Sequence, residues 1–148
     1  MGMSAFLALL LTSGALAVVP ELLVSPANVA YTENGDVILS AGASVTDVDS
    51  DDMSGASVQI TNVQTDDVLT ASVSDAAVTS SYAAGTGTLT FTGTATKAVY
   101  NSVLQGVKYK SDSQNPDATQ RNIAWIVTDS GSEASIAVTQ TVSITVVN

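Results

Sequence analysis

Apolar and polar residues alternate along most of this chain in short runs, which glycine-rich or acidic clusters separate. Successive side chains of a β-strand point to opposite faces, so a period of two residues predicts half-buried strands. The alternation begins after Pro20 and continues to the end of the chain. The predicted strands cover residues 28–33, 36–40, 56–63, 68–73, 78–82, 87–93, 107–110, 122–128 and 134–147.

One segment has a different period. Between residues 94 and 104, apolar side chains recur at helical spacing, and Thr94 or Thr96 can cap the first turn. The pattern therefore predicts a short helix near residues 96–104, inserted between two strands. Seven to nine strands at this spacing favour an all-β fold, an antiparallel β-sandwich with one short helix.

The run at residues 122–128 gives the strongest strand signal. It places Ile123, Trp125 and Val127 on one face. Together with Leu89 and Phe91, these side chains are expected in the interior. A lone Trp in an apolar strand is more often a core residue than a platform for stacking a sugar.

The chain of 148 residues suits one domain, and no internal repeat is evident in it. The formal charge is −10, from 14 acidic and 4 basic residues, and no basic residue precedes Lys97. This balance argues against nucleic acid as a partner and against charge-driven binding to an anionic membrane. Histidine and cysteine are both absent. Most nucleophilic, acid–base and transition-metal chemistry therefore lacks its usual residues, and we expect no enzyme activity.

The N-terminal segment, residues 1–19, is nearly all apolar or small, and residues 20–148 form the predicted folded domain. Three interpretations are open. The run Phe6 to Leu11 with Ala15-Leu16-Ala17 matches a secretory signal peptide cleaved after Ala17. The segment can instead be an apolar strand that inserts into a neighbouring copy and builds a head-to-tail filament. In the third interpretation it is retained as a membrane anchor, although it is at the short limit for a span.

An acidic loop at residues 47–55 carries four carboxylates within six positions, at Asp47, Asp49, Asp51 and Asp52. Ca²⁺ takes six to eight oxygen ligands, and carboxylates with loop carbonyls supply them. The predicted metal-binding residues are Glu33, Asp47, Asp49, Asp51 and Asp129. The alternative is a solvated loop that aids solubility.

The other acidic residues have simpler interpretations. Asp66, Asp67, Asp112 and Asp117 are expected on the surface. Asp129-Ser130-Gly131 is typical of the start of a β-turn, in which the aspartate accepts a backbone hydrogen bond and the glycine permits a positive φ.

Taken in order, several short motifs resemble a bacterial cadherin-like repeat of large surface adhesins. They are Ala30 to Gly35, Val45 to Ser50, Gly55 to Ile60, Gly87 to Gly93, Tyr100 to Tyr109, Arg121 to Ile123 and Val127 to Asp129. The resemblance covers about residues 20–148. It implies an immunoglobulin-like β-sandwich that is extracellular, non-catalytic and often stabilised by calcium.

The leading functional hypothesis is a secreted structural protein of the cell surface, either an adhesin module or a filament subunit that self-associates by strand exchange. The alternative is a secreted module that binds carbohydrate or another ligand. A membrane enters the picture only if residues 1–19 are retained as an anchor.

Overall fold

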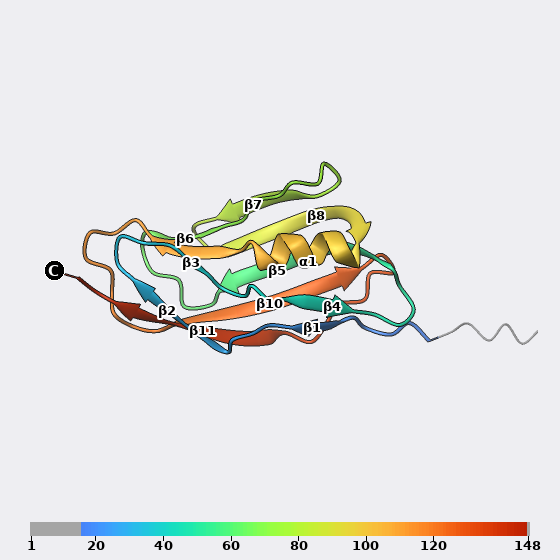
Figure 1. The fold of residues 1–148 in the computed structure, drawn as a ribbon, viewed down its shortest axis with the longest axis horizontal. Coiled ribbons are helices and arrows are strands. Elements are labelled where there is room, and N and C mark those ends of the chain that lie inside the picture. Colours follow the sequence, from blue (N-terminus) through green and yellow to red (C-terminus); the bar gives the residue numbers. More distant parts are fainter. Residues whose placement is uncertain (1–15, 148) are drawn as a thin grey trace, which may run out of the picture.

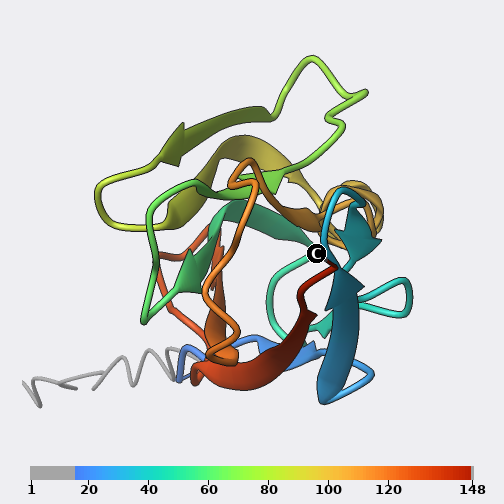
Figure 2. The ribbon, with the colours of Figure 1, turned by 90° about the vertical axis from the view of Figure 1, so that its left-hand side faces the viewer.

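The larger layer of the fold is a six-stranded sheet with the order β2-β11-β10-β5-β8-β7. The computed structural model describes residues 16–147, and Figure 1 shows their path. The strands of this sheet are β2 (Asn28–Thr32), β5 (Asp52–Ile60), β7 (Thr79–Ala83), β8 (Thr88–Thr96), β10 (Arg121–Asp129) and β11 (Val138–Thr145). Seen from the end in Figure 2, the sheet curves from β7 round to β2.

Two short sheets form the second layer. One pairs β1 (Glu21–Leu23) with β4 (Ser44–Thr46), and the other has the order β3-β9-β6. The strands of the latter are β3 (Val37–Ile38), β6 (Asp67–Thr70) and β9 (Lys108–Ser111). Buried apolar residues from both layers form one core cluster. The molecule is therefore an all-β sandwich with one short helix, as the sequence predicts.

Strand pairing is antiparallel with one exception among the described residues. β2 lies parallel to β11, with Asn28 opposite Thr141 and Thr32 opposite Thr145. This pairing places an early strand of the domain beside its last strand. Local alternation cannot predict the direction of such a pair, because the direction depends on how the chain crosses between the layers.

The predicted core residues are interior. Trp125 and Val127 are 0% exposed, Ile123 and Phe91 are 1% exposed, and Leu89 is 3% exposed. The Trp125 indole N–H donates to Oε1 of buried Gln140 at 3.2 Å. Gln140 in turn donates through Nε2 to the carbonyl oxygens of Leu39, at 2.6 Å, and Pro26, at 2.7 Å. Trp125 is thus a core residue with a satisfied polar atom, and it offers no sugar-stacking surface.

The helix α1 (Lys97–Gln105) begins at one of the two predicted caps, since the Thr96 side chain accepts a hydrogen bond from the Val99 N–H. Its buried face carries Tyr100, Val103 and Leu104. Two of its polar side chains form hydrogen bonds with the backbone of β4 and of the residue before it. Asn101 Oδ1 accepts from the Val45 N–H at 2.8 Å, and Gln105 Nε2 donates to the Ala43 carbonyl at 2.8 Å. The helix therefore satisfies backbone hydrogen-bonding groups that a neighbouring strand would otherwise pair with.

Two strands were not predicted. β1 and β4 are three residues each, too short for a periodic pattern to register. The strand β5 also begins earlier than expected, at Asp52, so the predicted acidic loop 47–55 is shorter than its sequence suggests. Met53 is fully buried there while its polar neighbours are only partly buried, which is strand alternation hidden in a polar stretch.

The chain turns at Asn34-Gly35, between the predicted strands 28–33 and 36–40. Asn34 has a φ of +69°, and the Gly35 N–H donates to the Thr32 carbonyl at 3.2 Å. The turn sends β2 and β3 into different sheets.

Of the apolar segment 1–19, the structure describes only residues 16–19, so its role as signal peptide, donor strand or anchor concerns residues that lie largely outside the described part. Leu16, Val18 and Val19 are exposed at the end of the sandwich where the described chain begins. Within residues 16–147, no helix is long and apolar enough to cross a membrane.

Candidate functional site

The acidic loop connects β4 to β5 at the same end of the sandwich as residues 16–19 (Figure 1). The Asp47 carboxylate shapes the loop, since its Oδ1 accepts hydrogen bonds from the backbone N–H groups of Asp49, at 3.2 Å, and Ser50, at 3.4 Å. Short-range bonds of this kind are typical of an Asx-turn. They hold the loop in a tight turn before β5 starts.

Lys97, the first residue of α1, also stabilises the loop through hydrogen bonds to its backbone. Its Nζ donates to the carbonyl oxygens of Asp47, at 2.8 Å, and Ser50, at 3.0 Å. The same ammonium lies 3.3 Å from Asp51 Oδ1. Asp51 is therefore paired with a lysine, and its side chain is fully exposed.

Three carboxylates meet beside this loop. Asp47, Asp49 and Asp129 each place one oxygen within 4.8 Å of the others. Asp129 comes from the far end of β10 and is only 2% exposed. About eighty positions separate Asp129 from Asp47 and Asp49 in the sequence, and the pairing of β10 with β5 brings the three residues together.

Asp129 also forms the turn that the sequence predicts. Its Oδ1 accepts from the Glu133 N–H at 2.8 Å, and its carbonyl accepts from the Ser132 N–H at 3.2 Å. The positive φ of this turn falls on Ser132, at +75°, and not on Gly131 as expected.

The donor set of this carboxylate group fits a hard divalent cation such as Ca²⁺. Asp47 Oδ2 is buried from solvent and accepts no hydrogen bond within the described residues. An orphaned buried carboxylate oxygen is costly unless something pairs with it. The three carboxylates can supply three to six of the six to eight oxygen ligands that Ca²⁺ takes, and loop carbonyls or water would supply the others.

The N-terminal stretch also contacts the group. The Val18 N–H donates to Asp49 Oδ2 at 2.9 Å. This bond is the largest cause that lowers the pKa of Asp49 below its ordinary value, and Asp47 contributes further. Asp49 is therefore held as an anion beside Asp47 and Asp129.

Two of the predicted metal-binding residues, Asp51 and Glu33, are not in this group. Glu33 lies elsewhere in the fold. Its N–H donates to the Thr145 carbonyl at 2.9 Å, and its Oε2 accepts from the Val147 N–H at 2.7 Å. Thr145 is at the end of β11 that lies beyond Arg121, whereas Asp129 is at the opposite end of β10. Glu33 thus tethers the C-terminal stretch at the other end of the sandwich.

The prediction that Asp67 lies on the surface is wrong. Asp67 is 2% exposed, and its Oδ2 lies 2.6 Å from Nε of the buried Arg121. Asp66, Asp112 and Asp117 are exposed, as expected. Asp66 and Asp67 are adjacent in the sequence, and both were expected on the surface. Adjacent side chains of a strand point to opposite faces, so the alternation of β6 could have indicated that Asp67 is buried and Asp66 exposed.

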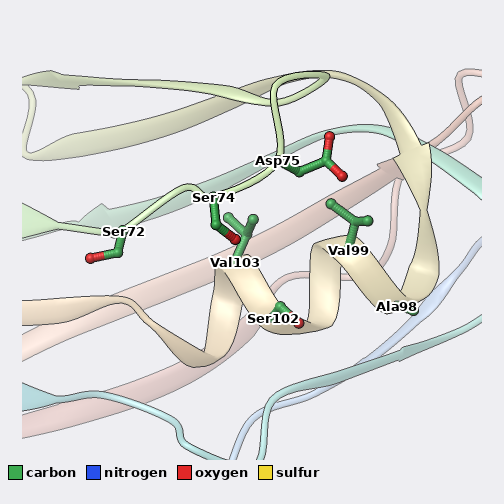
Figure 3. Close-up of a pocket in the computed structure, with 7 residues that line it drawn as sticks. All are labelled: Ser72, Ser74, Asp75, Ala98, Val99, Ser102 and Val103. Carbon is green, nitrogen blue, oxygen red and sulfur yellow. The ribbon is translucent and has the colours of Figure 1, made fainter.

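A separate cavity of about 300 Å³ lies between the loop that follows β6 and the side of α1 that carries Val99 and Val103 (Figure 3). Three serine hydroxyls and one carboxylate lie around an aliphatic surface. The lining residues are Ser72, Ser74, Asp75, Ala98, Val99, Ser102 and Val103. None of them is aromatic, so the cavity has hydrogen-bonding groups but no stacking platform.

Searches against protein-family models and against curated protein sequences give no match. Among solved structures, a cohesin module of a family 33 glycoside hydrolase from Clostridium perfringens aligns with 87% of this chain and 97% of its own, at 7% identity and a TM-score of 0.46. The SrpA adhesin from Streptococcus sanguinis aligns with 86% of this chain and 58% of its own, at 11% identity and a TM-score of 0.40. Likeness at this level does not assign the chain to a family.

Proposed function

We propose that this chain is a non-catalytic, extracellular structural module of cadherin-like type, which forms a surface adhesin or a self-assembling filament by strand exchange between copies. The observation that carries the proposal is a group of exposed apolar side chains at one end of the sandwich. Val18, Val19 and Ile136 line one depression there, and Val48 and Leu23 line two adjoining ones. Exposed apolar patches of this kind mark interaction sites.

The edges of the larger sheet support the same proposal. β2 and β7 are its outer strands, and neither contains a charged residue or a proline. Soluble proteins usually protect such edges with lysine, proline or a bulge, because an unprotected edge can pair with another chain. The resemblance to cadherin-like repeats adds the expectation of a cell-surface location.

The test compares the full chain with a variant that lacks residues 4–16. We expect the full chain to form assemblies in analytical ultracentrifugation and the truncated chain to sediment as a folded monomer with an unchanged circular dichroism spectrum. A full chain that remains monomeric at every concentration would remove the self-assembly part of the proposal.

Calcium is the second part of the proposal. We infer that Asp47, Asp49 and Asp129 hold one Ca²⁺ at the end of the module, and the orphaned oxygen of Asp47 supports this assignment. The ion would neutralise carboxylates that otherwise repel one another, and it would couple the acidic loop to β10 and, through Val18, to the N-terminal stretch.

A binding function is a second candidate, favoured by the cavity beside α1 (Figure 3). Its hydroxyls and carboxylate suit a small neutral ligand with several hydroxyl groups, such as a monosaccharide. Titration with monosaccharides, followed by the NMR shifts of Ser74, Asp75 and Ser102, tests this function. Absence of shifts at millimolar sugar would reject it.

A further inference from the structure

We propose that the apolar groove at the N-terminal end of the module is the acceptor site for strand exchange, and that residues 4–11 of a second copy occupy it. This inference rests on the proposed self-assembly and adds the place where the exchanged segment docks. The groove is lined by Val18, Val19, Pro20, Glu21, Leu22, Ile136 and Val138.

The groove is large and apolar enough to accept side chains. Its volume is about 390 Å³. Its walls come from the N-terminal stretch on one side and from the segment that leads into β11 on the other. Ile136 is 83% exposed there, although burial of an apolar side chain is favourable. Docking of an apolar segment would remove this exposed surface from water.

The strand β1 contributes to the groove and has one edge that is unpaired within the described residues. β1 is paired only with β4 among the described strands, so one edge of β1 has no neighbouring strand. Leu22 of β1 belongs to the groove lining. An extended segment can therefore pair its backbone with β1 while its alternate side chains enter the groove, which is the usual geometry of strand addition.

The acidic residues around the groove favour a docking segment without negative charge. Glu21 belongs to its lining, and Asp47 lies with Val18, Val19 and Val48 in the adjoining depression. Acidic segments are disfavoured at such a rim, and two modules that met end to end would repel each other. Residues 1–15 contain no ionisable side chain, and Phe6, Leu7, Leu9, Leu10 and Leu11 supply apolar ones.

The spacing between segment and module favours a second copy. Residues 12–17 connect the segment to its own module, and six extended residues span roughly 20 Å. That length is about twice the Debye length at 0.1 M salt, so exchanged modules can keep their acidic ends apart. A segment would have to reverse within these residues to reach its own groove, whereas the segment of a second copy enters without reversing.

Cysteine cross-linking tests the docking, because the chain has no native cysteine. Full-length Leu7→Cys and full-length Ile136→Cys are mixed and mildly oxidised. We expect a covalent pair that contains one copy of each variant. The matched control is Ile38→Cys, on β3 of another sheet and 46% exposed, which should cross-link with Leu7→Cys at least tenfold less.

A second set of variants measures the contribution of the groove to assembly. Ile136→Asp should weaken assembly of the full chain at least tenfold without changing the melting temperature, because Ile136 is mostly exposed. Ile38→Asp should leave assembly unchanged.

The outcomes separate this inference from the proposed function. Assembly without a Leu7–Ile136 cross-link would overturn the groove assignment and leave strand exchange standing. A chain that carries both Leu7→Cys and Ile136→Cys separates the two modes of docking. A purely intramolecular cross-link in it, at every concentration, would show that the segment docks on its own module and would overturn the exchange. Absence of assembly in the unmodified full chain would overturn both.

Discussion

Arg121 and Asp67 are 54 positions apart in the chain, yet they form an ion pair in the protein interior with Nε 2.6 Å from Oδ2. Their side chains are 1% and 0% exposed. Asp67 is fully paired, since its Oδ1 accepts from the Tyr109 hydroxyl at 2.7 Å and its Oδ2 also accepts from the Gln64 N–H at 2.8 Å. The pair joins β10 of one layer to β6 of the other.

Removal of one partner should therefore destabilise the fold strongly. We expect Arg121→Met or Asp67→Asn to lower the free energy of unfolding by about 3–5 kcal/mol, because each leaves a buried group without its partner. Urea denaturation measures this loss. The control is Asp112→Asn, which breaks the exposed pair with Lys110 and should cost about 0–1 kcal/mol. Equal losses in both variants would contradict the interior role of Asp67.

Trp125 should be the largest single contributor to the core. We expect Trp125→Ala to lower the free energy of unfolding by about 3–5 kcal/mol, since it opens a cavity and leaves Gln140 Oε1 without its donor. Trp125→Phe should cost less, because the ring still fills much of the space. Denaturation curves for the two variants decide the matter, and a loss below about 1 kcal/mol for Trp125→Ala would be inconsistent with a buried ring.

The bond between α1 and β4 gives a smaller effect. We expect Asn101→Ala to lower the free energy of unfolding by about 1–3 kcal/mol, because the partly buried Val45 N–H loses its acceptor. Ser102→Ala, at an exposed neighbouring position, is the control and should be nearly neutral. Similar stability of both variants would show that the edge of β4 does not depend on the helix.

Three tyrosines should resist ionisation at alkaline pH. Desolvation by burial is the main cause that raises the pKa of Tyr82, Tyr100 and Tyr109, and Asp67 adds to it for Tyr82 and Tyr109. A folded pKa above the unfolded value of about 10 means that this stabilisation is complete below pH 10 and is lost as the pH rises through the folded pKa.

Phenolate absorbance and circular dichroism, recorded together against pH, test this expectation. Ionisation of these three side chains should begin above pH 10 and coincide with unfolding, while the urea-unfolded chain should titrate near pH 10. Reversible ionisation of all of them near pH 10 in the folded protein would contradict their burial.

Calcium should raise the melting temperature of the protein. A ligand that binds only the native state stabilises it by about 2.7 kcal/mol at one hundred times its dissociation constant. We expect melting in millimolar Ca²⁺ to occur above melting in chelator. Asp47→Asn should reduce the shift, whereas Glu33→Gln, at the other end of the sandwich, should leave it intact. No shift together with no calorimetric heat of binding would remove the site.

Features that depend only on neighbouring residues can be predicted from the amino-acid sequence. The alternation around Trp125, the cap at Thr96 and the turn at Asp129 follow from local backbone geometry, and all three are present. The strand positions from residue 28 onward follow for the same reason, apart from their ends and the short β4. The side on which each strand buries its residues is a local property with a period of two.

Contacts between groups far apart in the sequence depend on the arrangement of the strands in three dimensions. Alternation does not order the strands, so the sequence grouped Glu33 with Asp47, Asp49 and Asp129, whereas the structure places Glu33 at the opposite end of the sandwich. The sequence could not pair Asp67 with Arg121 either, because a buried charge is tolerated only where its partner arrives from another strand. β1 and β4 depend on contacts across the sandwich, since three residues carry too little periodic signal of their own.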